Sequence, residues 1–149
     1  MKMEKRDLLY RPRRLRKSDN LRRLVRETHL HSDDLIAPVF VIEGNNIKND
    51  IPSMPGIYQW SVDRVSEEID KLHDAGIMRI ILFGIPAKKD ALGSDSYFEM
   101  GIIQNTVEKL KAEYSDLLII TDVCFCEYTD HGHCGVIHED DVHNDSTLA

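Results

Sequence analysis

Apolar residues along the chain form three short runs, separated by two stretches in which they recur at helical spacing. The runs are nearly continuous and rich in β-branched residues, which is typical of strands in a parallel sheet. They cover residues 35–42, 78–83 and 117–123. Between the first run and the first helical stretch, residues 44–56 contain the pair Asn45–Asn46 and two prolines, which predict a loop.

The first helical stretch has Ser61 in the position of an N-cap and Gly76 in the position just past a helix C-terminus. The second covers residues 102–114 and again has one apolar face. The apolar positions of the two stretches are Val62, Val65, Ile69 and Leu72, then Ile103, Val107, Leu110 and Tyr114.

Strands that alternate with helices predict an α/β fold with a parallel sheet. Residues 144–149, the last of the sequence, predict the start of a further helix. With only three predicted strands, the third would have an unpaired edge. A complete eight-stranded barrel needs about 250 residues. We therefore expect these 149 residues to be the first part of a larger fold.

The net charge of -7 conceals an uneven distribution. Residues 1–26 hold eleven of the 19 basic residues and only three of the 26 acidic ones. A basic N-terminal arm could lie on the acidic remainder of the same molecule or of a neighbouring subunit. Nucleic-acid binding is the competing interpretation, but Tyr10 is the one aromatic residue of the arm and the acidic remainder would repel phosphates.

All three cysteines lie in one segment after the third run: Cys124, Cys126 and Cys134. On an extended backbone Cys124 and Cys126 would project to the same side, and the glycine-flanked turn could return Cys134 to them. Three thiolates at a strand end predict a zinc site with an open coordination position, which is typical of catalytic zinc. The absence of a signal-like or membrane-spanning apolar segment favours a reducing cytoplasm over secretion or a membrane location.

Other interpretations of this segment remain open. Isolated cysteines are often buried hydrophobic residues, and the C-x-C-x7-C spacing is not that of a zinc finger. A disulfide is a further alternative. His131 or His133 could supply a fourth ligand and close the site. Asp122 ends the same strand and is either a solvated carboxylate or a partner for an ammonium group or a proton.

Several strings of the sequence resemble the porphobilinogen synthase family, also called 5-aminolevulinate dehydratase. The resemblance covers essentially the whole chain, and the cysteine segment is its most specific part. The matching strings are Arg11–Arg16, Leu35–Val41 with Glu43–Gly44, Ser53–Gly56, Leu82–Pro86 with Lys89–Asp90 and Gly93–Ser94, Asp122–Cys126, and Tyr128–Gly135.

The resemblance implies a (β/α)8 TIM barrel preceded by an extended N-terminal arm. Residues 1–33 would be the arm between subunits, and residues 34–149 the first three strands and two helices of a truncated barrel. The family condenses two 5-aminolevulinate molecules to porphobilinogen in haem and other tetrapyrrole biosynthesis, usually as a homo-octamer. The resemblance assigns zinc to Cys124, Cys126 and Cys134, an active-site carboxylate to Asp122, and leaves open an allosteric Mg²⁺.

The sequence departs from the family at one important point. The two lysines that hold substrate as Schiff bases belong to later strands of the family's barrel, and Lys88 and Lys89 match a different loop. We therefore expect the 149 residues alone to be inactive as a synthase. The alternative is a non-catalytic fragment that binds zinc or docks on complete subunits through its arm.

Overall fold

The computed structural model describes residues 12–148. The chain divides into two compact units, Met1–His31 and Ser32–Ala149. Residues 1–11 of the predicted arm and Ala149 lie outside the described residues.

The described part of the first unit contains a 3-10 helix, η1 (Pro12–Arg16), and a short α-helix, α1 (Asp19–Leu24). The Ser18 hydroxyl caps α1 by accepting a hydrogen bond from the Leu21 N–H at 3.2 Å. Asp19 pairs with Arg22 and Arg23 on the helix surface. No residue from Arg13 to His31 is buried, so this segment has no hydrophobic core of its own.

The described part of the second unit is built on a five-stranded sheet with the order β2-β3-β1-β4-β5. The strands β3, β1, β4 and β5 are parallel, and β2 is antiparallel to β3. The predicted parallel sheet is therefore confirmed. The strands are β1 (Ala37–Ile42), β2 (Lys48–Asp50), β3 (Tyr58–Ser61), β4 (Arg79–Ile85) and β5 (Leu118–Thr121).

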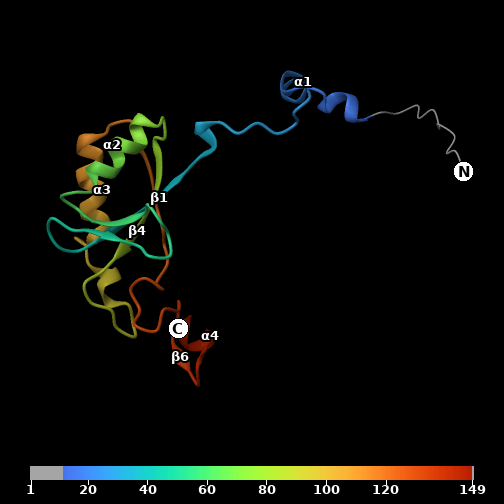
Figure 1. The fold of residues 1–149 in the computed structure, drawn as a ribbon. Helices are drawn as coiled ribbons and strands as arrows, with labels where there is room; N and C mark the ends of the chain where they lie inside the picture. Colours follow the sequence, from blue (N-terminus) through green and yellow to red (C-terminus); the bar gives the residue numbers. More distant parts are fainter. Residues whose placement is uncertain (1–11, 149) are drawn as a thin grey trace, which may run out of the picture. The chain divides into compact units, whose positions relative to one another are not determined.

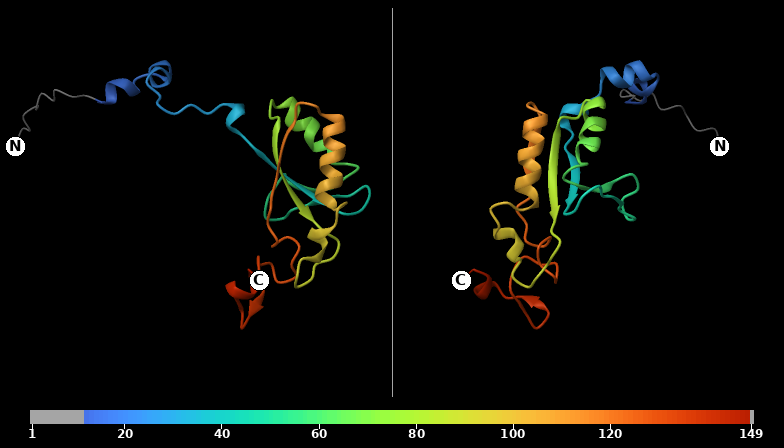
Figure 2. Two further views of the ribbon diagram at one scale, coloured as in Figure 1. Left: turned by 180° about the vertical axis from the view of Figure 1, so that it is seen from behind. Right: turned by 90° about the vertical axis from the view of Figure 1, so that its left-hand side faces the viewer.

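Two α-helices, α2 (Ser66–Asp74) and α3 (Ile102–Glu113), lie side by side and pack on one face of the sheet (Figure 1; Figure 2). Burial alternates along β4, so every second side chain faces the helices. In the part of the chain that the structure describes, the core contains ten buried hydrophobic residues: Val39, Val41, Trp60, Val65, Ile69, Ile80, Leu82, Ile102, Leu110 and Leu117.

The opposite face of the sheet is only partly buried. Phe40 and Phe83 stack there with ring centroids 5.2 Å apart. We had expected a strand covered on both faces at residues 35–42, whereas helices cover one face of β1 in the described part of the chain.

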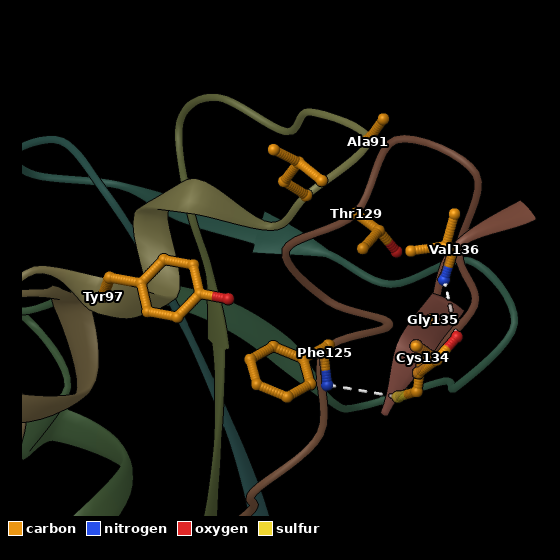
Figure 3. A pocket seen from close by; sticks show the side chains of 9 residues that line it. Ala91, Tyr97, Phe125, Thr129, Cys134, Gly135 and Val136 are labelled. Carbon is orange, nitrogen blue, oxygen red and sulfur yellow. Dashed lines mark hydrogen bonds between the residues drawn. The ribbon is translucent and has the colours of Figure 1, made fainter. Parts of the chain in front are cut away.

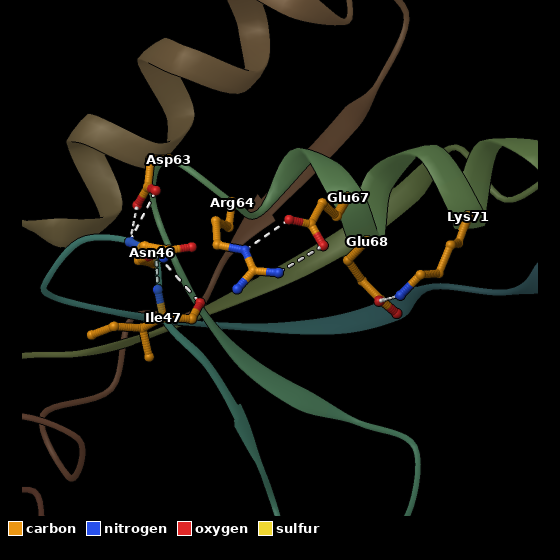
Figure 4. A network of polar contacts seen from close by, with 8 residues as sticks. Asn46, Ile47, Asp63, Arg64, Glu67, Glu68 and Lys71 are labelled. Carbon is orange, nitrogen blue, oxygen red and sulfur yellow. Dashed lines mark hydrogen bonds and ion pairs between the residues drawn. The ribbon is translucent and has the colours of Figure 1, made fainter.

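The predicted start of the first helix was wrong. Ser61 ends β3, and α2 begins only at Ser66. The Ser61 hydroxyl accepts the Ile47 N–H at 2.9 Å, and the Asp63 carboxylate accepts the Asn46 N–H at 3.0 Å, so both side chains fasten the loop before β2 (Figure 4). At the other end of the helix Gly76 has a φ of 76°, as predicted for the position after the C-cap.

The last strand of the sheet differs from the predicted buried run at residues 117–123. Strand β5 pairs only with β4 in the described sheet, and Leu118 is 52% exposed. The chain then forms a small hairpin and a short helix: β6 (Ile137–His138), β7 (Asp141–Val142) and α4 (Asn144–Thr147). No helix among residues 12–148 is both long enough and apolar enough to cross a membrane.

Candidate metal centre

The three cysteines lie beyond the C-terminal ends of the parallel strands. Cys124 and Cys126 follow β5 directly, and Cys134 returns from the far side of the next loop. We call residues 124–134 the cysteine loop. Chemistry in parallel α/β folds gathers at this end of the sheet, because the loops there converge on one edge.

The structure brings the three sulfur atoms together. Cys134 Sγ lies 3.2 Å from Cys126 Sγ and 3.3 Å from Cys124 Sγ. All three ligand atoms lie within 4.8 Å of one another, and all three cysteines are free thiols. The sulfurs therefore form one cluster at the edge of the sheet.

A turn after Cys124 contributes to this convergence. The N–H groups of Tyr128 and Thr129 both donate to the Phe125 carbonyl, at 2.9 and 3.0 Å, and reverse the chain after Cys126. The Phe125 N–H donates to Cys134 Sγ at 3.2 Å (Figure 3). The predicted turn that returns Cys134 to the other two thiols is therefore present, and it begins at Phe125, so that Cys126 already lies in the turn.

Contacts among the thiols shift the pKa values of Cys126 and Cys134 in opposite directions. Hydrogen bonds from Cys126 and Cys124, together with the Phe125 N–H, lower the pKa of Cys134. The contact with Cys134, followed by that with Cys124, raises the pKa of Cys126 to about 12. Cys134 is therefore the first of these two thiols to become a thiolate, which is the form that binds a metal.

The cluster fits a zinc ion. Tetrahedral zinc with Zn–S bonds of about 2.3 Å holds its sulfurs a little under 4 Å apart, so the two contacts of Cys134, at 3.2 and 3.3 Å, need only a small expansion. Neither predicted histidine joins the cluster. His131 Nε2 lies 3.3 Å from the Ala91 carbonyl, and His131 Nδ1 accepts the His133 N–H at 3.2 Å. Among the described residues the cluster offers three sulfur atoms, so a tetrahedral ion held by them would keep a position for a further ligand.

Asp122 lines a cavity of about 270 Å³ that also reaches Cys124 and Tyr128. Its backbone N–H donates to the Leu82 carbonyl at 3.3 Å and so continues the pairing of β5 with β4. Burial, followed by the negative charge of Asp122, raises the pKa of Glu127 nearby. The structure thus places Asp122 beside one of the cysteines, in the same cavity.

A second cavity, of about 170 Å³, borders Cys134 (Figure 3). Its wall includes Ala91, Leu92 and Tyr97, which come from the loop after β4. The sequence analysis did not predict a role for this loop at the site. Asp90 ahead of Gly93–Ser94 could have indicated a fixed turn here, because aspartate side chains often accept backbone N–H groups a few residues further along.

Comparison with known proteins identifies the family. Residues 9–149 match the family described as delta-aminolevulinic acid dehydratase. A protein of that name from Halalkalibacterium halodurans is 51% identical over 138 residues, which cover 93% of this chain and 42% of that protein. Another of that name, from Ruminiclostridium josui, is 46% identical over 95% of this chain and 69% of its own length.

A solved structure of porphobilinogen synthase from Toxoplasma gondii, in complex with its reaction product porphobilinogen, superposes with a TM-score of 0.85 at 32% identity. The match covers 95% of this chain and 41% of that one. With the parallel sheet, this confirms the predicted fold class, part of a (β/α)8 barrel. The chain spans less than half the length of most of the relatives described above. It belongs to the delta-aminolevulinic acid dehydratase family.

Proposed function

We propose that this chain supplies the metal-binding part of a zinc-dependent porphobilinogen synthase, a lyase that condenses two molecules of 5-aminolevulinate. The family match supports the reaction. The observation that carries the proposal for the metal is the convergence of three cysteine sulfurs within 4.8 Å at the edge of the sheet.

In this proposal Cys124, Cys126 and Cys134 hold the zinc. When bound, zinc supplies Lewis-acid polarisation of substrate oxygen or nitrogen groups. Asp122 faces the same cavity as Cys124, so its carboxylate oxygens can accept a hydrogen bond from a substrate ammonium group and receive its proton. The turn at Phe125 keeps the thiols in place for this chemistry.

For the complete enzyme we propose a cytoplasmic homo-octamer in which the basic arm contacts a neighbouring subunit, with Mg²⁺ as a second, allosteric metal. A reducing compartment would keep the three thiols available for zinc. The charge of residues 1–26 supports the role of the arm, because it is opposite to that of the remainder. Neither nucleic acid nor a membrane is needed as a partner.

The 149 residues alone should form no porphobilinogen. They cover 42% of the related enzyme from Halalkalibacterium halodurans, and the resemblance implies that the family's Schiff-base lysines belong to later strands. The measurement is turnover of 5-aminolevulinate by the purified chain with Zn²⁺. Product above a metal-free blank would contradict this expectation, whereas zinc binding without turnover fits a chain that contributes only the metal centre.

Titration with Co²⁺ tests the metal centre, because sulfur-to-cobalt charge-transfer absorbance reports thiolate ligands directly. The wild-type chain should bind one Co²⁺ with this absorbance, and Zn²⁺ should displace it. Cys134→Ala should weaken binding by more than about 100-fold, beyond the usual effect of a residue outside the ligand set.

The matched control for that titration is His133→Ala, which changes the residue next to Cys134 but leaves all three thiols in place. This variant should bind Co²⁺ like the wild type. Full binding by Cys134→Ala, or loss of binding in His133→Ala alone, would contradict the proposed ligand set.

A further inference from the structure

The loop after β4 contacts the cysteine loop although it contributes no cysteine. We call residues 88–97 the brace loop. The Asp90 carbonyl accepts the Asp130 N–H at 3.1 Å, and Asp90 forms a parallel bridge with Thr129. His131 Nε2 lies 3.3 Å from the Ala91 carbonyl. The brace loop thus touches three consecutive residues of the cysteine loop.

The side chain of Asp90 fixes the shape of the brace loop. Its Oδ1 accepts the N–H of Leu92 at 2.9 Å and the N–H of Ser94 at 3.0 Å. Hydrogen bonds to a charged acceptor are stronger than those to a neutral one. The Asp90 side chain therefore sets the turn while its backbone is bound to the cysteine loop.

Gly93 allows the two loops to pack closely. It has a φ of 62°, a left-handed conformation that side chains disfavour. A Cβ atom at Gly93 would lie 3.3 Å from Tyr128 Cβ and 3.6 Å from Thr129 Cγ2. The turn that Asp90 stabilises thus brings Gly93 directly against the residues that follow Cys126.

Thr129 connects this contact to the third sulfur. It is only 4% exposed, and its hydroxyl donates to the His133 carbonyl at 3.0 Å. His133 immediately precedes Cys134. A continuous set of contacts therefore leads from Asp90 through Thr129 to the backbone that orients Cys134.

We propose that Asp90 is a positioning residue for the metal centre: through Thr129 it holds Cys134 beside the other two thiols. The inference rests on the proposed zinc site for its metal-binding consequence. The effect of Asp90 on the distance between the sulfurs can be tested without a metal.

The first test compares Co²⁺ affinity in Asp90→Ala and Asp90→Asn. Alanine removes the acceptor for Leu92 and Ser94, whereas asparagine keeps one oxygen in its place. Asp90→Ala should weaken Co²⁺ binding about 10- to 100-fold, as expected for a residue outside the ligand set, and Asp90→Asn should restore most of the affinity. Glu99→Ala, which removes an exposed acid shortly after the brace loop, should bind like the wild type.

The second test uses no metal. Diamide oxidises two thiols to a disulfide while it is itself reduced, so the initial rate of Cys134 crosslinking, measured by peptide mass spectrometry, reports how often Cys134 lies beside another thiol. Asp90→Ala should slow this crosslinking, and so should Thr129→Val, which has nearly the same shape but no hydroxyl. Urea unfolding of each variant establishes that it is folded before the comparison.

The outcomes separate the two proposals. A wild-type chain that binds no Co²⁺ would overturn the proposed metal centre, and the crosslinking rates would still decide the role of Asp90. Unchanged affinity and unchanged crosslinking in a folded Asp90→Ala variant would overturn the positioning role. Loss of Co²⁺ affinity in Asp90→Ala with no change in the crosslinking of Cys134 would also overturn it, because the sulfurs would then still lie together.

Discussion

Gly84 of β4 allows the sheet to approach helix α3 closely. A Cβ atom at this position would lie 2.8 Å from Ile103 Cγ1 and 2.9 Å from Ile102 Cγ2. Both isoleucines belong to the first turn of α3, and Ile102 is part of the buried core. Any side chain at residue 84 would therefore require these isoleucine side chains, or the helix that carries them, to shift away from the strand that leads to the brace loop.

Gly84→Ala should lower the free energy of unfolding by about 1–3 kcal/mol, the usual cost of overpacking a core. Urea unfolding followed by circular dichroism measures it. In the double variant with Ile103→Ala, the combined loss should be smaller than the sum of the single losses, because the truncated isoleucine makes room. Strictly additive losses would contradict the close approach.

Helices α2 and α3 are joined by polar contacts near the C-terminal end of α3. The Tyr114 hydroxyl donates to Asp70 Oδ1 at 2.7 Å, and the Ser66 hydroxyl donates to Glu113 Oε2 at 2.5 Å. Lys109 also pairs with Glu113. These contacts fix the relative position of two helices that share one face of the sheet.

Tyr114→Phe should cost about 1 kcal/mol of unfolding free energy at neutral pH, because Asp70 loses its donor. Burial, followed by the hydrogen bond to Asp70, raises the pKa of Tyr114 to about 12. In the unfolded chain a tyrosine phenol loses its proton near pH 10, so the folded state holds the Tyr114 proton more tightly. The stabilising contribution is complete below about pH 10 and is lost as the pH rises towards 12.

Urea midpoints of the wild type and Tyr114→Phe at about pH 8 and pH 11 measure this effect, since the two pH values lie on either side of the ordinary tyrosine pKa. The difference between the two proteins should shrink at the higher pH. A difference that stays constant would show that the phenol proton does not contribute to the pairing of the helices. The comparison with phenylalanine removes the effect of other groups that titrate in the same range.

Across the whole molecule, the two compact units differ in how they are stabilised. Ser32–Ala149 contains the hydrophobic core and the cysteine cluster. Residues 13–31 have no buried side chain, and the ion pairs among them are exposed. Exposed ion pairs contribute little to stability.

Removal of residues 1–31 should therefore change the unfolding free energy of the second unit by no more than about 0.5 kcal/mol, as is usual for surface changes. Co²⁺ stoichiometry should be the same with and without the arm. Urea unfolding and metal titration of the shortened chain test both statements. A large loss of stability would show that the basic arm packs on the second unit and belongs to its folded core.

The spacing of apolar residues predicted an element correctly where the packing of that element follows its own local sequence pattern. The apolar run at residues 78–83 became β4, and the helix with Ile103, Val107 and Leu110 on one face became α3. Strand β3 was missed because Tyr58–Ser61 is short and follows a turn-rich segment. Its position is set by pairing with β1, a contact between residues distant in the sequence.

The sequence by itself determined the alternation of strands and helices, the family likeness, and which residue types could bind a metal, because these follow from composition and local spacing. Only the tertiary structure decided how Cys134 meets the other thiols and which histidines stay outside the cluster. It alone also brought Asp90 against Thr129. The physical reason is that these arrangements depend on hydrogen bonds between two loops whose separation in the sequence carries no periodic signal.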